Sequence, residues 1–216
     1  MPTSDYHPIS AVLDVIEQIK PASILDIGVG FGRWGILCRE ILEIYNERML
    51  PDQWKIRIEG IEIHEPFRNP FWSIAYDKVH IGNASEVISR LGNYDLIICG
   101  DVIEHFDKEA GEQFLKEMLK HGQFVIVTSP NGYMPQGATH GDEYQRHRSG
   151  WTERDFRSIP YKFKIITSTF VSILSSDQKK LDAINFYNEL ELLGVKKGFF
   201  MLFKLFWVHA MRRLRR

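Results

Sequence analysis

The residues whose spacing points most clearly to chemistry form a glycine-rich turn in the first third of the chain. The segment from Ile24 to Gly32 reads Ile-Leu-Asp-Ile-Gly-Val-Gly-Phe-Gly, an apolar run followed by three alternating glycines. A strand that enters a helix through glycines lets a ligand approach bare backbone amides at the positive end of that helix. A tight structural turn without a ligand is the simpler interpretation.

The position of Asp26 distinguishes two classes of ligand for this turn. Gly30, Gly32 and Gly35 fit the dinucleotide fingerprint, which binds a pyrophosphate. A carboxylate two residues before Gly28 would repel a pyrophosphate and attract a cationic ligand. Gly35 also falls well inside the helix predicted after the turn. We therefore favour a cationic ligand over a dinucleotide.

Read as Asp-x-Gly-x-Gly-x-Gly, the turn resembles motif I of the class I S-adenosylmethionine-dependent methyltransferases. The resemblance implies that Glu62, at the end of the second strand, binds the ribose hydroxyls, and that Asn83 and Ala84 hold the adenine. Each has a plainer interpretation: Glu62 as a solvated acid and Asn83 as a helix cap. Glu59 competes with Glu62 by position, although it lies in the middle of the strand.

A second segment, from Tyr94 to Phe106, reads Tyr-Asp-Leu-Ile-Ile-Cys-Gly-Asp-Val-Ile-Glu-His-Phe. It is similar to motif IV of the small-molecule branch of these enzymes, which contains the ubiquinone-biosynthesis O-methyltransferases. In the strand order that the resemblance implies, strands one and four are neighbours, and their carboxyl ends border one crevice. S-adenosylmethionine is the expected cofactor, with the predicted contacts Asp26, Gly28, Gly30, Gly32, Glu62, Ile63, Asn83, Ala84, Gly100 and Asp101.

The elements that must position these motifs alternate along the chain. Apolar periodicity predicts strands at 23–27, 56–63, 78–81, 94–99 and 124–128, with helices at 9–19, 33–49, 84–91 and 108–119 between them. Residues 161–174 would supply one or two further strands. The expected fold is Rossmann-like α/β, with a mostly parallel seven-stranded sheet flanked by helices. Residues 129–150 form a turn-rich stretch that predicts a lid, or else an irregular surface loop.

If the acceptor is a hydroxyl, methyl transfer also needs a base. His105 is the first candidate because it follows Asp101 by about one helical turn, and His147 in the lid is the second. Either histidine would otherwise only shape its loop. Asn131, Tyr133, Arg146 and Arg148 are the candidate acceptor-binding residues, and the two arginines would pair with an anionic acceptor.

The sequence predicts no metal site. His140, Asp142, Glu143 and His147 lie close together in the lid, but their spacing matches no familiar zinc pattern and no cysteine is nearby. The two cysteines, Cys38 and Cys99, stand among apolar residues and predict buried thiols in a reducing compartment.

Charge divides the chain into two parts. The 216 residues carry a net charge of -1, yet all seven basic residues from 196 to 216 lie in a segment without acids, which leaves residues 1–195 at -8. We predict a methyltransferase domain over 1–195 and a basic, apolar C-terminal helix over 196–216. Residues 198–216 would bind an anionic membrane surface or pack on protein. A nucleic-acid partner is not expected, because the basic and aromatic residues do not alternate.

Together these features predict a cytoplasmic enzyme, peripheral on the inner face of the membrane if the C-terminal segment binds lipid. Its expected reaction is methylation, on oxygen, of a small-molecule, saccharide or lipid-linked acceptor. Two alternatives stay open: an NAD(P)-dependent oxidoreductase, and a catalytically silent cofactor-binding protein anchored by its tail. The sequence does not specify the oligomeric state.

Overall fold

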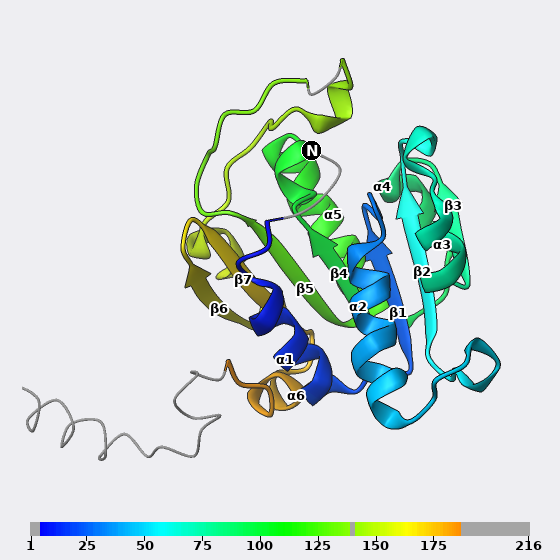
Figure 1. Ribbon diagram of the computed structural model, residues 1–216. Helices are drawn as coiled ribbons and strands as arrows, with labels where there is room; N and C mark the ends of the chain where they lie inside the picture. Colours follow the sequence, from blue (N-terminus) through cyan, green and yellow to red (C-terminus); the bar gives the residue numbers. More distant parts are fainter. Residues whose placement is uncertain (1–4, 139–140, 187–216) are drawn as a thin grey trace, which may run out of the picture. The chain divides into compact units, whose positions relative to one another are not determined.

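A seven-stranded sheet forms the centre of the computed structural model, which describes residues 5–138 and 141–186 (Figure 1). Its strand order is β3-β2-β1-β4-β5-β7-β6. Every strand pairing is parallel except the two made by β7, which is antiparallel to both β5 and β6. The strands are β1 (Ser23–Ile27), β2 (Arg57–Glu62), β3 (Lys78–Ile81), β4 (Tyr94–Gly100), β5 (Gly122–Pro130), β6 (Tyr161–Ile166) and β7 (Thr169–Leu174). The predicted fold class is confirmed, and 161–174 supplies a pair of strands.

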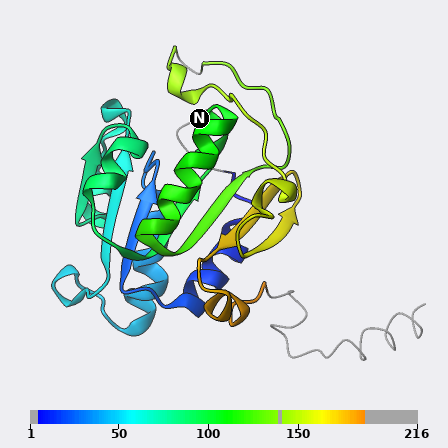
Figure 2. The same ribbon diagram turned by 180° about the vertical axis from the view of Figure 1, so that it is seen from behind.

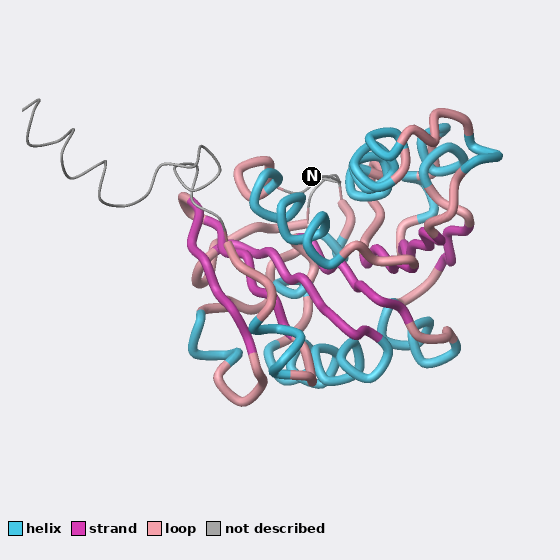
Figure 3. Tube along the Cα trace, turned by 90° about the horizontal axis from the view of Figure 1, so that it is seen from below, coloured by secondary structure: helices cyan, strands magenta, loops and turns pink. Residues whose placement is uncertain are grey.

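Helices cover both faces of this sheet (Figures 2 and 3). On one face α2 lies between α1 and α3 and contacts both, and α4 and α5 lie on the other face. The helices are α1 (Ile9–Ile19), α2 (Arg33–Leu42), α3 (Pro70–Ala75), α4 (Ala84–Val87), α5 (Lys108–His121) and α6 (Gln178–Asp182). Both faces of the central strands are therefore buried, which explains why β4 reads as a continuous apolar run.

The helix predicted over 33–49 is shorter in the structure, and the reason lies in Glu43. Helix α2 ends at Leu42, and a single 3-10 turn, Ile44–Asn46, follows. The fully buried Glu43 carboxylate accepts hydrogen bonds from the backbone N–H groups of Lys55 and Ile56, at 2.7 and 2.6 Å. These bonds hold the returning chain against the helix end, so the helix cannot continue.

Two further elements differ from the prediction. The helix expected over 84–91 divides into α4 and a 3-10 turn, Ile88–Arg90. Helix α3 was not predicted at all, although its start carries ordinary signals: the Asn69 side chain accepts from the Phe71 N–H, and Pro70 occupies the first turn.

The lid begins at Asn131, since β5 continues to Pro130 and takes the first two residues of the predicted segment. Both of its ends are tied to the body. The Gly132 N–H donates to the Trp151 carbonyl at 2.7 Å, and the N–H groups of Arg148 and Ser149 donate to the Glu104 carbonyl at 2.8 and 3.1 Å. Trp151 is fully buried against the core and so anchors the return of the chain.

The predicted domain boundary at 195 and the segment 196–216 lie outside the described residues. Residues up to Ile184 belong to one compact unit. Among the residues that the structure describes, none of the helices has the length and apolarity needed to cross a membrane.

Candidate active site

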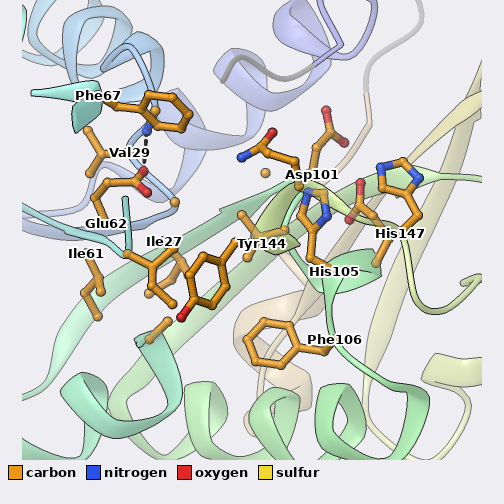
Figure 4. Close-up of a pocket in the computed structure, with 18 of the residues that line it drawn as sticks. Ile27, Val29, Ile61, Glu62, Phe67, Asp101, His105, Phe106, Tyr144 and His147 are labelled. Carbon is orange, nitrogen blue, oxygen red and sulfur yellow. Dashed lines mark hydrogen bonds between the residues drawn. The ribbon is translucent and has the colours of Figure 1, made fainter. Parts of the chain in front are cut away.

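A cavity of about 590 Å³ opens at the carboxyl ends of β1, β2 and β4, beneath the lid. Figure 4 shows Glu62 and Phe67 at one end of it, His105 and His147 at the other, and Tyr144 between the two ends. Because strands β1 and β4 are neighbours in the sheet, the two sequence motifs meet here as expected.

The glycine turn forms one wall of this cavity, and at Gly28 there is no room for a side chain. Gly28 has a φ of +76°, and a Cβ there would lie 2.4 Å from Cγ2 of Val102. The N–H groups of Gly28 and Val29 donate to the Ile61 carbonyl, which fixes the turn against β2. The glycine thus allows the loop after β4 to approach the turn closely.

Glu62 occupies the position that the methyltransferase resemblance implies. Its side chain is buried, lines the cavity and accepts hydrogen bonds from the backbone N–H groups of Gly30 and His64, both at 2.8 Å. Burial raises the pKa of the carboxyl, and these two bonds oppose the shift. Each carboxylate oxygen can accept more than one hydrogen bond, so acceptor capacity remains for a ligand.

Asp26 does not line the cavity, so the expected direct contact with a cationic donor is not what the structure shows. Its side chain lies on the opposite side of β1 from Ile27, which does line the cavity, because successive side chains of a strand alternate. Asp26 accepts a 2.5 Å hydrogen bond from the Tyr76 hydroxyl. Burial raises its pKa to about 7. Its role here is to hold β1 and the end of α3 together.

Asp101 lines the cavity in a strained conformation, with a φ of +53°. Its carboxylate accepts from the Asp5 N–H at 2.6 Å and from the Thr128 hydroxyl at 3.3 Å. Burial raises its pKa. Asp5 also lines the cavity and donates this bond from near the start of the described chain, a contribution that no sequence motif indicated.

All but one of the remaining predicted cofactor residues line the cavity. Gly30, Ile63, Asn83, Ala84 and Gly100 line the cavity. The Asn83 side chain also accepts from the Ser85 N–H at 3.0 Å, so it caps α4 as the plainer interpretation held. Gly32 does not line the cavity. With a φ of +91°, it serves as the N-cap residue of α2.

Both candidate bases reach the lid end of the cavity. The ring centroids of His105 and His147 lie 5.0 Å apart. The Nδ1 atom of His105 is 3.1 Å from the Arg146 carbonyl oxygen, and that of His147 is 2.7 Å from the Met134 carbonyl oxygen. Burial lowers the pKa of His105, which favours its neutral form near pH 7. The lid therefore brings together two imidazoles that are 42 residues apart in sequence.

Of the four predicted acceptor-binding residues, only Arg148 lines the cavity. Arg146 is exposed, does not line the cavity, and is paired with Glu143 through two hydrogen bonds of 2.8 and 3.0 Å. Asn131 bridges to Trp151 at the base of the lid. Tyr133 is 60% exposed, and its hydroxyl lies 3.4 Å from the His147 carbonyl oxygen. His140 falls outside the described residues.

Several further residues line the cavity that the sequence analysis assigned to no ligand. Phe67 and Phe106 provide apolar walls, and Tyr144 and Gln136 enter from the lid. Glu104 lines the cavity too, where its side chain is only 2% exposed. The sequence offered one clue, the place of Glu104 beside His105 in the second motif, and only the fold shows that its side chain is buried at the cavity.

Neither a protein-family model nor any curated protein sequence matches the chain. Several solved structures do match the chain. A putative O-methyltransferase from Nostoc punctiforme matches with a TM-score of 0.54 and 20% identity, over 77% of this chain and 55% of that one. The methyltransferase domain of a bacterial CtHen1 matches with a TM-score of 0.54 and 16% identity, over 78% of this chain and 97% of that one. The N-terminal domain of EvdMO1 with S-adenosylhomocysteine bound matches with a TM-score of 0.55 and 12% identity, over 79% and 81%.

The chain thus has the class I methyltransferase fold, and the comparison defines no narrower branch. It spans about half the length of the Nostoc protein.

Proposed function

We propose that this protein is an S-adenosylmethionine-dependent methyltransferase that methylates an oxygen of a small-molecule, saccharide or lipid-linked acceptor. One observation carries the proposal. A single cavity joins the glycine turn and Glu62 at one end to His105 and His147 at the other. A donor and an acceptor placed at these ends would meet inside one space closed by the lid.

The residues present fit the proposed cofactor. Gly28 keeps one wall free of a side chain, Glu62 keeps acceptor capacity for ribose hydroxyls, and Asn83 lies where the adenine is expected. Glu62 and Asp101 are acids, and acids favour a cationic ligand over a pyrophosphate. The antiparallel β7 also separates this sheet from the all-parallel 3-2-1-4-5-6 order that is typical of dinucleotide-binding domains.

When bound, S-adenosylmethionine would supply a methyl group carried on a positively charged sulfur. The acceptor oxygen would bond to that methyl carbon in line, and S-adenosylhomocysteine would leave with the sulfur electrons. The protein has to align the acceptor and exclude water, and alignment alone is worth about 7–11 kcal/mol. The lid and the aromatic walls would exclude water from this space. His105, neutral because burial lowers its pKa, would take the proton of the acceptor hydroxyl, a contribution of about 10² to 10⁴ in rate.

Calorimetry with S-adenosylhomocysteine and with NAD tests the cofactor. We expect binding of the first and none of the second; binding of NAD alone would favour an oxidoreductase. Turnover of labelled S-adenosylmethionine against panels of saccharide, phenolic and lipid-linked hydroxyl acceptors then tests the reaction. Tight cofactor binding without turnover on any panel would favour the catalytically silent alternative.

A further inference from the structure

Three side chains with metal-ligand chemistry meet at the lid end of the cavity. One ligand atom from each of Glu104, His105 and His147 lies within 4.8 Å of the other two. All three residues line the cavity, and Figure 4 shows the two imidazoles beside each other. Glu104 and His105 belong to the loop after β4, whereas His147 comes from the lid. Two separate segments therefore present oxygen and nitrogen ligands to one point.

Glu104 is the residue that points to a cation. Its side chain is 2% exposed, and among the described residues its Oε2 atom has no hydrogen-bond partner. A buried carboxylate oxygen that lacks a hydrogen-bond partner is costly, and a bound cation would supply a partner for Oε2.

Both imidazoles are oriented as metal-binding histidines usually are. In each ring Nδ1 lies within hydrogen-bond distance of a backbone carbonyl, that of Arg146 for His105 and that of Met134 for His147. A carbonyl accepts only from a protonated Nδ1, so the neutral ring carries its free lone pair on Nε2. Such a second hydrogen bond fixes the ring and its tautomer toward a metal.

We propose that Glu104, His105 and His147 bind one divalent first-row transition ion, of the kind represented by Zn²⁺ or Co²⁺, and that the ion ties the lid to the loop after β4. Two imidazoles and one carboxylate suit such ions. Three protein ligands leave coordination positions open, and these would face the cavity. Bonds of about 2.0–2.2 Å place two ligand atoms of one ion at most about 4.4 Å apart. The three ligand atoms, all within 4.8 Å of one another, are close enough to reach such positions by small side-chain movements.

This site differs from the set considered in the sequence, with which it shares only His147. It also changes the role of His105, because one Nε2 lone pair cannot both bind an ion and accept a proton from an acceptor. Binding of the ion does not depend on the proposed methyl transfer. The two proposals can therefore fail separately.

Cobalt binding to the full-length protein, after treatment with a chelator, tests the site. We expect one Co²⁺ per chain by calorimetry, with visible absorption bands from nitrogen and oxygen ligands. Glu104→Gln and His147→Gln should each weaken binding by more than about tenfold. Glu143→Gln in the same lid and His121→Gln on α5 are the matched controls and should bind like the wild type. Thermal unfolding of each variant shows that it is folded.

Limited proteolysis tests the link to the lid without measuring activity. Arg146 is exposed in the lid, and Lys120 is an exposed trypsin site on α5. Co²⁺ should slow cleavage after Arg146 in the wild type, leave cleavage after Lys120 unchanged, and have no effect on His147→Gln.

Absence of binding at millimolar Co²⁺ would overturn the proposal, and so would binding that Glu104→Gln and His147→Gln leave intact. Cobalt binding that depends on these residues without protecting Arg146 would overturn the link to the lid. Binding of S-adenosylhomocysteine, measured in the same samples, reports on the proposed function independently.

Discussion

Asp26 and Glu62 are two buried acids that the methyltransferase resemblance assigned to the same ligand, and the fold gives them different surroundings. Glu62 lines the cavity with two backbone donors on its carboxylate. Asp26 is turned away from the cavity and bonded to Tyr76. Strand alternation is the cause, since Ile27 beside it faces the cavity instead. A carboxylate near the glycine turn favours a cationic ligand over a pyrophosphate, and in the fold the carboxylate that faces the ligand space is that of Glu62 and not that of Asp26.

Replacement of Glu62 by Gln should lower the affinity for S-adenosylhomocysteine by about tenfold or more, because a neutral amide accepts hydrogen bonds from hydroxyls less strongly than a carboxylate. Glu59→Gln is the matched control. Glu59 lies in the same strand, but its carboxylate is bonded to Arg57 and His80 outside the cavity. Calorimetry on both variants would decide between these two acids, and equal losses would contradict the assignment.

Asp26 should make the stability of the protein depend on pH. Its pKa is about 7 in the folded chain against an ordinary value of 3.8, so between these values the folded state holds a proton that the unfolded state has lost. Stability from this group is therefore complete below about pH 4 and falls as the pH rises to 7. At about 1.4 kcal/mol per pKa unit the total is a few kcal/mol.

Asp26→Asn should remove this dependence. Urea unfolding at pH 5 and pH 8 would then show that the variant gains stability relative to the wild type at the higher pH. The exposed Asp52→Asn is the control, and parallel pH curves for Asp26→Asn and the wild type would contradict the prediction.

At the scale of elements, the site depends on close approach between the glycine turn and the loop after β4. Periodicity placed the strands and the helices α1 and α5 well, because burial of both sheet faces leaves a strong apolar signal. It failed where a single long-range bond decides, as at Glu43, whose carboxylate ends α2 by binding the backbone of Lys55 and Ile56. Helix α3 has only six residues, too few to show a period.

Gly28→Ala should destabilise the protein by about 1–3 kcal/mol, from the positive φ and from a Cβ 2.4 Å from Val102 Cγ2. Gly92→Ala is the control, since a Cβ at that glycine meets nothing within 4 Å. Denaturant midpoints of the two variants measure the difference. A Gly28→Ala variant as stable as Gly92→Ala would show that the loops can separate without cost.

For the whole molecule, the division of charge remains the main feature that the described residues do not explain. The acidic part contains the cavity acids Glu62 and Asp101, while the seven basic residues of 196–216 lie beyond the described chain. We expect the two parts to bind different partners, a cationic cofactor and an anionic surface.

Charge reversal in the full-length chain tests this expectation. Exchange of Arg212, Arg213, Arg215 and Arg216 for Glu should abolish sedimentation with vesicles rich in anionic lipid, since each base near such a surface is worth about 1 kcal/mol. Binding of S-adenosylhomocysteine should not change. Unaltered sedimentation would favour the alternative in which this segment packs on protein.

The sequence by itself determined the strands and the glycine turn, because apolar periodicity and turn residues depend on neighbours in the chain. The convergence of the two motifs on one crevice followed from the strand order that the methyltransferase resemblance implied, and the sheet has that order. Only the tertiary structure decided which acid faces the cavity, that Arg146 is bonded to Glu143, and that Glu104, His105 and His147 meet. These outcomes depend on side-chain direction and on the path of the lid, which the packing of Trp151 into the core fixes. No spacing between residues 105 and 147 encodes that path.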